Sequence, residues 1–94
     1  MKNEPQKPNP EQIAEWMLEE LDRSEYLYQE DVVIEIDNRF GEGFTYLNEN
    51  GNLAIDKRVL NAFKKFTGDT VVWEKGERMW RKRESHDADG RAQE

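Results

Sequence analysis

The sequence predicts a small α+β domain with three helices, a C-terminal β-hairpin and a smaller hairpin inserted between the second and third helices. Three observations lead to this class. Apolar residues recur at helical spacing in three segments, an Asn-Gly pair separates two short apolar runs, and alternating apolar residues flank a turn at Lys75-Gly76. The chain has 94 residues, which is enough for one domain with a single modest core.

The expected domain spans residues 9–83. Residues 1–8 are polar, contain two prolines and have no apolar residue after Met1, so we expect a disordered leader. Residues 84–94 contain only two alanines as apolar content, so we expect a disordered tail there as well.

The first helix is marked at its start by Asn9, Pro10 and Gln12, which match a capping box with proline at the first helical position. We expect it to end by Arg23 or Ser24. Its apolar face is formed by five residues: Ile13, Ala14, Met17, Leu18 and Leu21.

A brief strand at residues 26–28 leads into a second helix, expected from about Gln29 to Phe40 with Gly41 as its stop. The β-branched run at residues 32–36 can also be interpreted as a strand. The apolar spacing of four residues that ends at Phe40, together with the glycine after it, favours the helix.

An inserted hairpin is predicted around Asn50-Gly51, because both residues tolerate positive φ and short apolar runs flank them. Asp56 then caps the third helix, which ends at Thr67-Gly68. On a helical wheel this helix has one apolar face and one basic face, with Asn61 at the centre of the basic arc. The apolar face is formed by Val59, Leu60, Phe63 and Phe66, of which Phe63 is the expected core residue.

The C-terminal hairpin is expected from residues 70–74 and 78–83. A two-residue turn at Lys75-Gly76 would place Val71, Trp73 and Trp80 on one face, and would place Val72 and Met79 on the other. Trp80 is expected to seal the hairpin against the helices, with stacking on a base as the alternative.

The order of helix, short strand, helix, helix and hairpin over residues 10–83 resembles a winged helix-turn-helix domain. The resemblance implies that the third helix is the recognition helix and that the C-terminal hairpin is the wing. Residues 41–55 depart from the pattern, because winged domains join these two helices by a short turn. The chain also resembles a family of small uncharacterised bacterial proteins, through Arg39-Phe40-Gly41, Asn50-Gly51-Asn52-Leu53 and Val72-Trp73-Glu74 ahead of Trp80-Arg81. That second resemblance implies no activity.

Charge is segregated along the chain. Residues 56–83 carry net +5, residues 1–55 net −9 and residues 84–94 net −3, within a total of −7. A basic helix and wing on such a protein predict a nucleic-acid contact, in which Lys and Arg neutralise phosphates and Asn61 is a candidate adenine reader. The candidate residues are Lys57, Arg58, Asn61, Lys64, Lys65, Arg78, Arg81 and Lys82. The total charge of −7 opposes binding to DNA at long range.

The competing hypothesis is a protein-interaction adaptor or homodimer that pairs acidic helices with the basic face. We expect no catalysis, no cofactor and no metal site. There is no cysteine or phosphate-binding loop, and the single histidine, His86, lies in the expected tail. The absence of cysteine and of a long apolar run makes a cytoplasmic protein the expectation, with no membrane contact.

Overall fold

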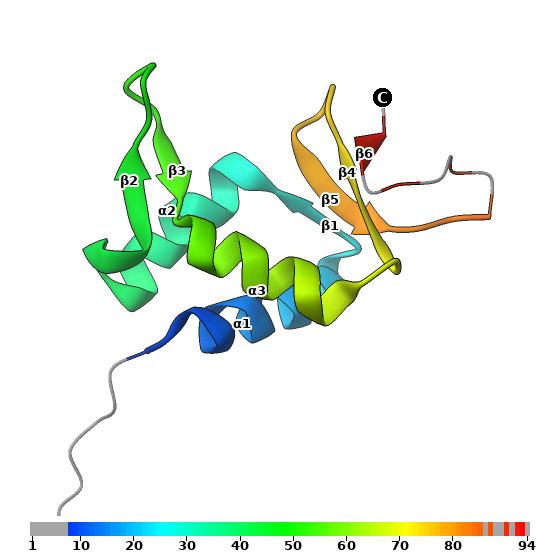
Figure 1. Ribbon diagram of the computed structural model, residues 1–94, viewed down its shortest axis with the longest axis horizontal. Coiled ribbons are helices and arrows are strands. Elements are labelled where there is room, and N and C mark those ends of the chain that lie inside the picture. Colours follow the sequence, from blue (N-terminus) through cyan, green and yellow to red (C-terminus); the bar gives the residue numbers. More distant parts are fainter. Residues whose placement is uncertain (1–7, 86, 88–89, 91, 94) are drawn as a thin grey trace, which may run out of the picture.

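Three helices and small β-sheets form the mixed α+β fold that the sequence predicts (Figure 1). The computed structural model describes residues 8–85, 87, 90 and 92–93. The elements are α1 (Pro10–Ser24), β1 (Tyr26–Tyr28), α2 (Gln29–Phe40), the 3-10 turn η1 (Glu42–Phe44), β2 (Thr45–Leu47), β3 (Leu53–Ile55), α3 (Lys57–Thr67), β4 (Val71–Glu74), β5 (Met79–Lys82) and β6 (Ala92–Gln93).

Local signals set the ends of the helices. The Asn9 side chain accepts a hydrogen bond from the Gln12 N–H at 2.8 Å, and the Asn9 N–H donates to Gln12 Oε1 at 3.0 Å, so the predicted capping box is confirmed. The segment from Gln29 to Phe40 is helical, which settles the alternative between helix and strand. Gly41 follows it with φ of 93°, a conformation that favours glycine.

The larger sheet has the order β1-β5-β4-β6, and β2 and β3 form a separate antiparallel pair. The β1–β5 and β5–β4 pairs are antiparallel, whereas β6 runs parallel to β4. In Figure 1 the β2–β3 and β4–β5 hairpins stand at opposite ends of α3.

The β4–β5 turn has four residues, because Trp73 pairs with Trp80 and Glu74 with Met79. Arg78, the last turn residue, has φ of 55°, and its N–H donates to the Glu74 carbonyl at 2.8 Å. Turns of two and four residues have the same parity. Each side chain therefore keeps its predicted face, although the turn is longer than the two residues on which that assignment depended.

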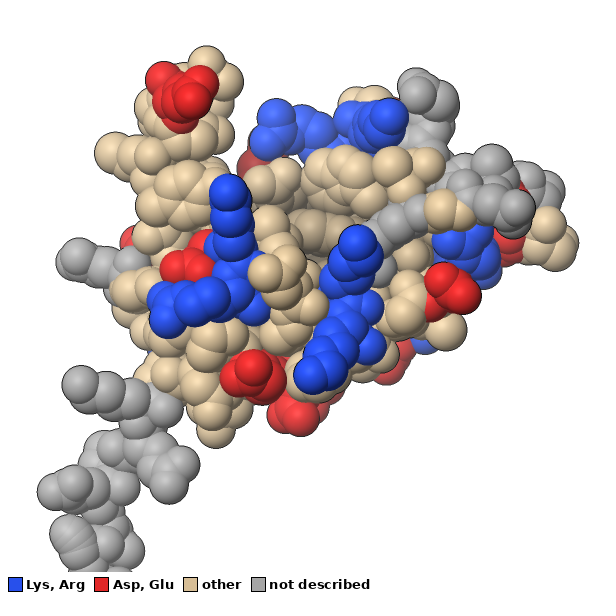
Figure 2. All heavy atoms as spheres, viewed as in Figure 1, with Lys and Arg blue, Asp and Glu red and all other residues tan. Residues whose placement is uncertain are grey.

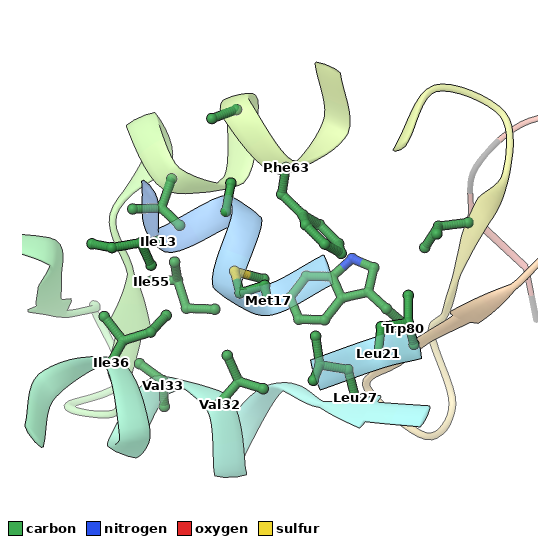
Figure 3. Packing of buried hydrophobic residues seen from close by; sticks show 14 residues of the cluster. Ile13, Met17, Leu21, Leu27, Val32, Val33, Ile36, Ile55, Phe63 and Trp80 are labelled. Carbon is green, nitrogen blue, oxygen red and sulfur yellow. The ribbon is translucent and has the colours of Figure 1, made fainter. Parts of the chain in front are cut away.

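The core lies where α1, α2, α3 and the inner face of the hairpin meet (Figure 3). Phe63 is fully buried, as predicted, and its ring meets Trp80 edge-on with centroids 5.5 Å apart. Phe66, expected on the same apolar face, is 41% exposed. It lies in the last turn of α3, where Thr67 takes the buried position and donates its hydroxyl to the Phe63 carbonyl at 2.8 Å.

The chain continues to make contacts beyond the expected domain limit at residue 83. Strand β6 pairs with β4 so that Ala92 lies opposite Trp73, and the Arg83 side chain donates to the Gly90 carbonyl at 2.5 Å. Both contacts involve the tail expected for residues 84–94, along the β4 edge. Residues 1–7 of the expected leader, and residues 86, 88–89, 91 and 94, lie outside the described residues.

None of the helices in the described part of the chain is long and apolar enough to cross a membrane.

The burial of Phe63 generates a stability prediction. Phe63→Ala should lower the free energy of unfolding by about 3–5 kcal/mol, because it removes a fully buried ring from the junction of α3 and the hairpin. Phe66→Ala, three residues along the same helix, should cost less than about 1 kcal/mol because its ring is largely exposed. Urea denaturation of both variants measures the difference, and equal losses would contradict this packing.

Candidate nucleic-acid interface

The side of α3 opposite the core carries five exposed polar residues, which are Lys57, Arg58, Asn61, Lys64 and Lys65. They share one side of the helix because Val59 and its buried neighbours occupy the other. Within the described residues, no acidic side chain pairs with any of these three lysines. Figure 2 shows Lys and Arg gathered over α3 and over the β4–β5 turn, with Asp and Glu bordering α3 on the side of α1.

Arg58 holds the start of α3 in place. Asp56, the N-cap, accepts from the Arg58 N–H at 2.7 Å and also from Nε and Nη2 of the Arg58 guanidinium, each at 3.0 Å. These bonds lower the pKa of Asp56, with the side-chain bond from Arg58 as the main cause. Arg58 Nη2 also donates to the Gly43 carbonyl at 3.2 Å, so this arginine ties α3 to η1.

Arg78 lies at the end of the β4–β5 turn and is exposed. Its guanidinium donates to Gln29 Oε1 at 3.4 Å, which links the turn to the start of α2. The charge of Arg78 has no acidic partner among the described side chains, so it remains available to an anion beside the turn.

Arg81 does not join the basic face of α3. It lies on the outer face of the sheet, opposite to the face of Trp80, and its side chain is only 13% exposed. Its guanidinium donates to Asp87 at 2.7 and 2.9 Å and to Glu74 at 2.8 Å. These bonds raise the pKa of Arg81, with Asp87 as the larger cause. The charge of Arg81 is therefore used inside the protein.

Lys82 is also separated from α3. Its Nζ lies 2.5 Å from Asp22 Oδ1, near the end of α1, and both side chains are more than half exposed. Of the eight candidate residues, the structure brings together Lys57, Arg58, Asn61, Lys64 and Lys65, which we call the basic face, and it disperses Arg78, Arg81 and Lys82.

A groove of about 350 Å³ lies beside the basic face, between α3 and the β4–β5 hairpin. Trp73 is half-buried in it, whereas Trp80 behind it is only 5% exposed. Trp80 therefore seals the hairpin against the helices, as expected, and is too buried to stack on a base. The groove is lined by Gln29, Leu60, Asn61, Phe63, Lys64, Trp73, Trp80 and Ala92.

Sequence reasoning missed this groove. Gln29, Trp73 and Ala92 come from three distant parts of the chain, and no local pattern joins them. The one available signal was that Trp73 and Trp80 share a strand face, which placed both rings on the side of α3.

Within the described residues, no three His, Cys, Asp or Glu side chains gather in a way that could hold a metal ion. His86 lies outside the described residues.

These features define a small α+β domain with an exposed basic helix beside an aromatic groove. The chain belongs to a family of unknown function, DUF6953, whose model matches residues 9–82. The matched segment runs from the α1 cap to the end of β5, so the tail that carries Asp87 and β6 lies beyond it. Searches of curated proteins and of solved structures find no match.

Arg81 and Lys82 are adjacent on β5 and provide a matched test of structural charge. Arg81→Gln should lower the free energy of unfolding by about 2 kcal/mol, because it leaves two partly buried carboxylates without their shared cation. Lys82→Gln should cost less than about 1 kcal/mol, because its ion pair is exposed. Thermal denaturation measures both, and a larger loss for Lys82→Gln would contradict the described network.

The Asp56 cap predicts a pH dependence. The folded pKa of Asp56 lies below its unfolded value, so its stabilisation is present above the unfolded pKa and is lost as pH falls through the folded pKa. Asp56→Ala should cost about 1 kcal/mol at pH 7, and this difference should shrink below about pH 4. Asp56→Asn, a neutral residue that also caps well, should keep much of the stability and lose this pH dependence. Denaturant titrations across pH measure all three proteins, and a pH-independent cost for Asp56→Ala would refute the assignment.

Proposed function

We propose that this protein is a non-catalytic, winged-helix-like module that binds nucleic acid through the basic face of α3 and the β4–β5 turn. The observation that carries the proposal is the row of Lys57, Lys64 and Lys65 on one exposed side of α3, with no acidic partner among the described side chains. Unpaired lysines on a helix can neutralise phosphates at no cost in broken ion pairs.

The arrangement of the sheet supports the winged-helix comparison. Strand β1 pairs with β5, β5 pairs with β4, and the β4–β5 hairpin packs against α3 through Trp80 and Phe63. A recognition helix and wing have this relation in winged domains. The inserted β2–β3 hairpin stands at the other end of α3, so in this view it leaves the basic face open (Figures 1 and 2).

The acidic α1 limits the expected affinity. α1 packs along α3, so its exposed acids lie close enough to repel phosphate at low salt. On the described part of the basic face and at Arg78, the cations that can contact phosphate are three lysines, Arg78 and Arg58, whose guanidinium also bonds Asp56. Three to five such contacts predict a plot of log affinity against log salt with a slope between about −3 and −5.

The test is binding to a blunt DNA duplex at several salt concentrations. Lys64→Glu with Lys65→Glu should abolish binding and leave the fold intact, because both side chains are exposed and point away from the core. The matched control is Arg23→Glu with Arg39→Glu, which changes the net charge equally. Arg23 pairs with Glu20 and Arg39 pairs with Glu35. Both acids line a cavity between α1 and α2, and none of the residues lining that cavity comes from the described part of α3, so the control changes charge away from the basic face. The control should bind nearly as well as the wild type.

Equal losses in the two double variants would show that net charge alone governs binding, and no binding by the wild type at low salt would end the proposal. In that case light scattering of the same variants tests the adaptor hypothesis. A dimer that Lys64→Glu and Lys65→Glu dissociate would assign the basic face to protein contact.

A further inference from the structure

The groove between α3 and the β4–β5 hairpin has an aromatic wall, a base-sized space and a cation at its rim. We propose that it binds an unpaired nucleotide, with the base against Trp73 and the phosphate at Lys64. This inference rests on the proposed nucleic-acid function and deepens it, because it assigns the groove to unpaired nucleotides and leaves the rest of the basic face to the phosphates of a duplex.

The wall of the groove is preorganised. Trp73 and Trp80 lie with ring centroids 4.7 Å apart, and Trp80 in turn meets the buried Phe63 at 5.5 Å. Trp80 thus supports the Trp73 ring and is itself supported by Phe63, and Trp73 is the half-buried ring of the three. An indole held in this way stacks on a base without losing much conformational entropy on binding.

The polar groups of the groove suit a nucleotide better than an apolar ligand. Asn61 and Lys64 are one helical turn apart on α3, and both are exposed where they line the groove. The Asn61 amide offers one acceptor and two donors, which match the edge of a base, and the Lys64 ammonium suits a phosphate. With Gln29 on the α2 side, polar groups from two helices converge on one apolar space.

The size of the groove sets the form of the ligand. Its volume of about 350 Å³ falls at the lower end of small-molecule sites, which span about 300–1,000 Å³. A base inside a duplex has both faces covered by its neighbours and cannot present one to Trp73. The nucleotide must therefore be unpaired, either in a single strand or overhang or as a free nucleotide.

Ala92 of β6 forms part of the wall and provides a variant that spares the core. It lies opposite Trp73 in the sheet and is exposed, so Ala92→Phe would fill groove space without replacing a buried residue. Trp73→Leu removes the stacking surface more directly but also removes a ring that packs against the core.

The experiment measures how a short oligothymidylate and thymidine monophosphate quench tryptophan fluorescence. As a duplex reference, binding of a labelled blunt DNA duplex is measured by its anisotropy. The background is Trp16→Phe, because Trp16 lines the cavity between α1 and α2 and would add unrelated signal. Oligothymidylate should quench the fluorescence. Ala92→Phe should weaken this binding by about tenfold to a hundredfold, the range expected for one lost stacking contact. Trp73→Leu should weaken it by as much, measured by anisotropy of labelled oligothymidylate because this variant lacks the reporter ring. Blunt-duplex binding should change less than about twofold in Ala92→Phe.

The outcomes separate this inference from the proposed function. Duplex binding without quenching by oligothymidylate, or oligothymidylate binding that Ala92→Phe leaves unchanged, overturns the groove proposal and leaves the proposed function standing. If oligothymidylate quenches the wild type, Ala92→Phe abolishes that quenching, and the wild type does not bind the duplex, the groove proposal is supported and the duplex interface is overturned. Thymidine monophosphate that binds as tightly as the oligomer identifies the free nucleotide as the ligand, whereas much weaker binding identifies a strand.

Discussion

The contact between Trp80 and Phe63 is the interaction on which the rest of the structure depends. Trp80 pairs with Leu27 on one side and with Trp73 on the other, so it sits at the centre of the antiparallel part of the sheet. Its ring meets Phe63 from the middle of α3 at 5.5 Å, edge to face. Together with the packing of α1 along α3, this junction holds the apolar side of α3 inward and leaves its basic face toward water.

The positively charged side chains fall into two groups: those that pair with acids within the protein, and those that remain exposed on α3. Arginines and lysines near the ends of elements are paired with acids, as Arg58 is with Asp56, Arg81 with Glu74 and Asp87, and Lys82 with Asp22. The lysines in the exposed arc of α3 have no such partner among the described residues. A net charge of +5 over residues 56–83 therefore overstates the charge that a ligand would meet, and the usable part is concentrated on one helix.

The basic face could be predicted because helical periodicity is local. Lys57, Asn61, Lys64 and Lys65 lie within nine residues, and once the segment is a helix their shared side follows from its pitch. Arg81 and Lys82 could not be assigned in this way. Their acidic partners, Asp87 and Asp22, lie elsewhere in the chain, and no local pattern shows which acid each strand cation will meet.

By itself the sequence determined the order, type and approximate ends of the helices and hairpins, because caps, periodicity and turn residues act over a few positions. Tertiary structure alone decided the four-residue turn, the exposure of Phe66, the placement of β6 on the β4 edge and the groove lined by Trp73. Each of these depends on which surfaces meet across distant parts of the chain. Packing then selects among arrangements that local preferences leave nearly equal in energy.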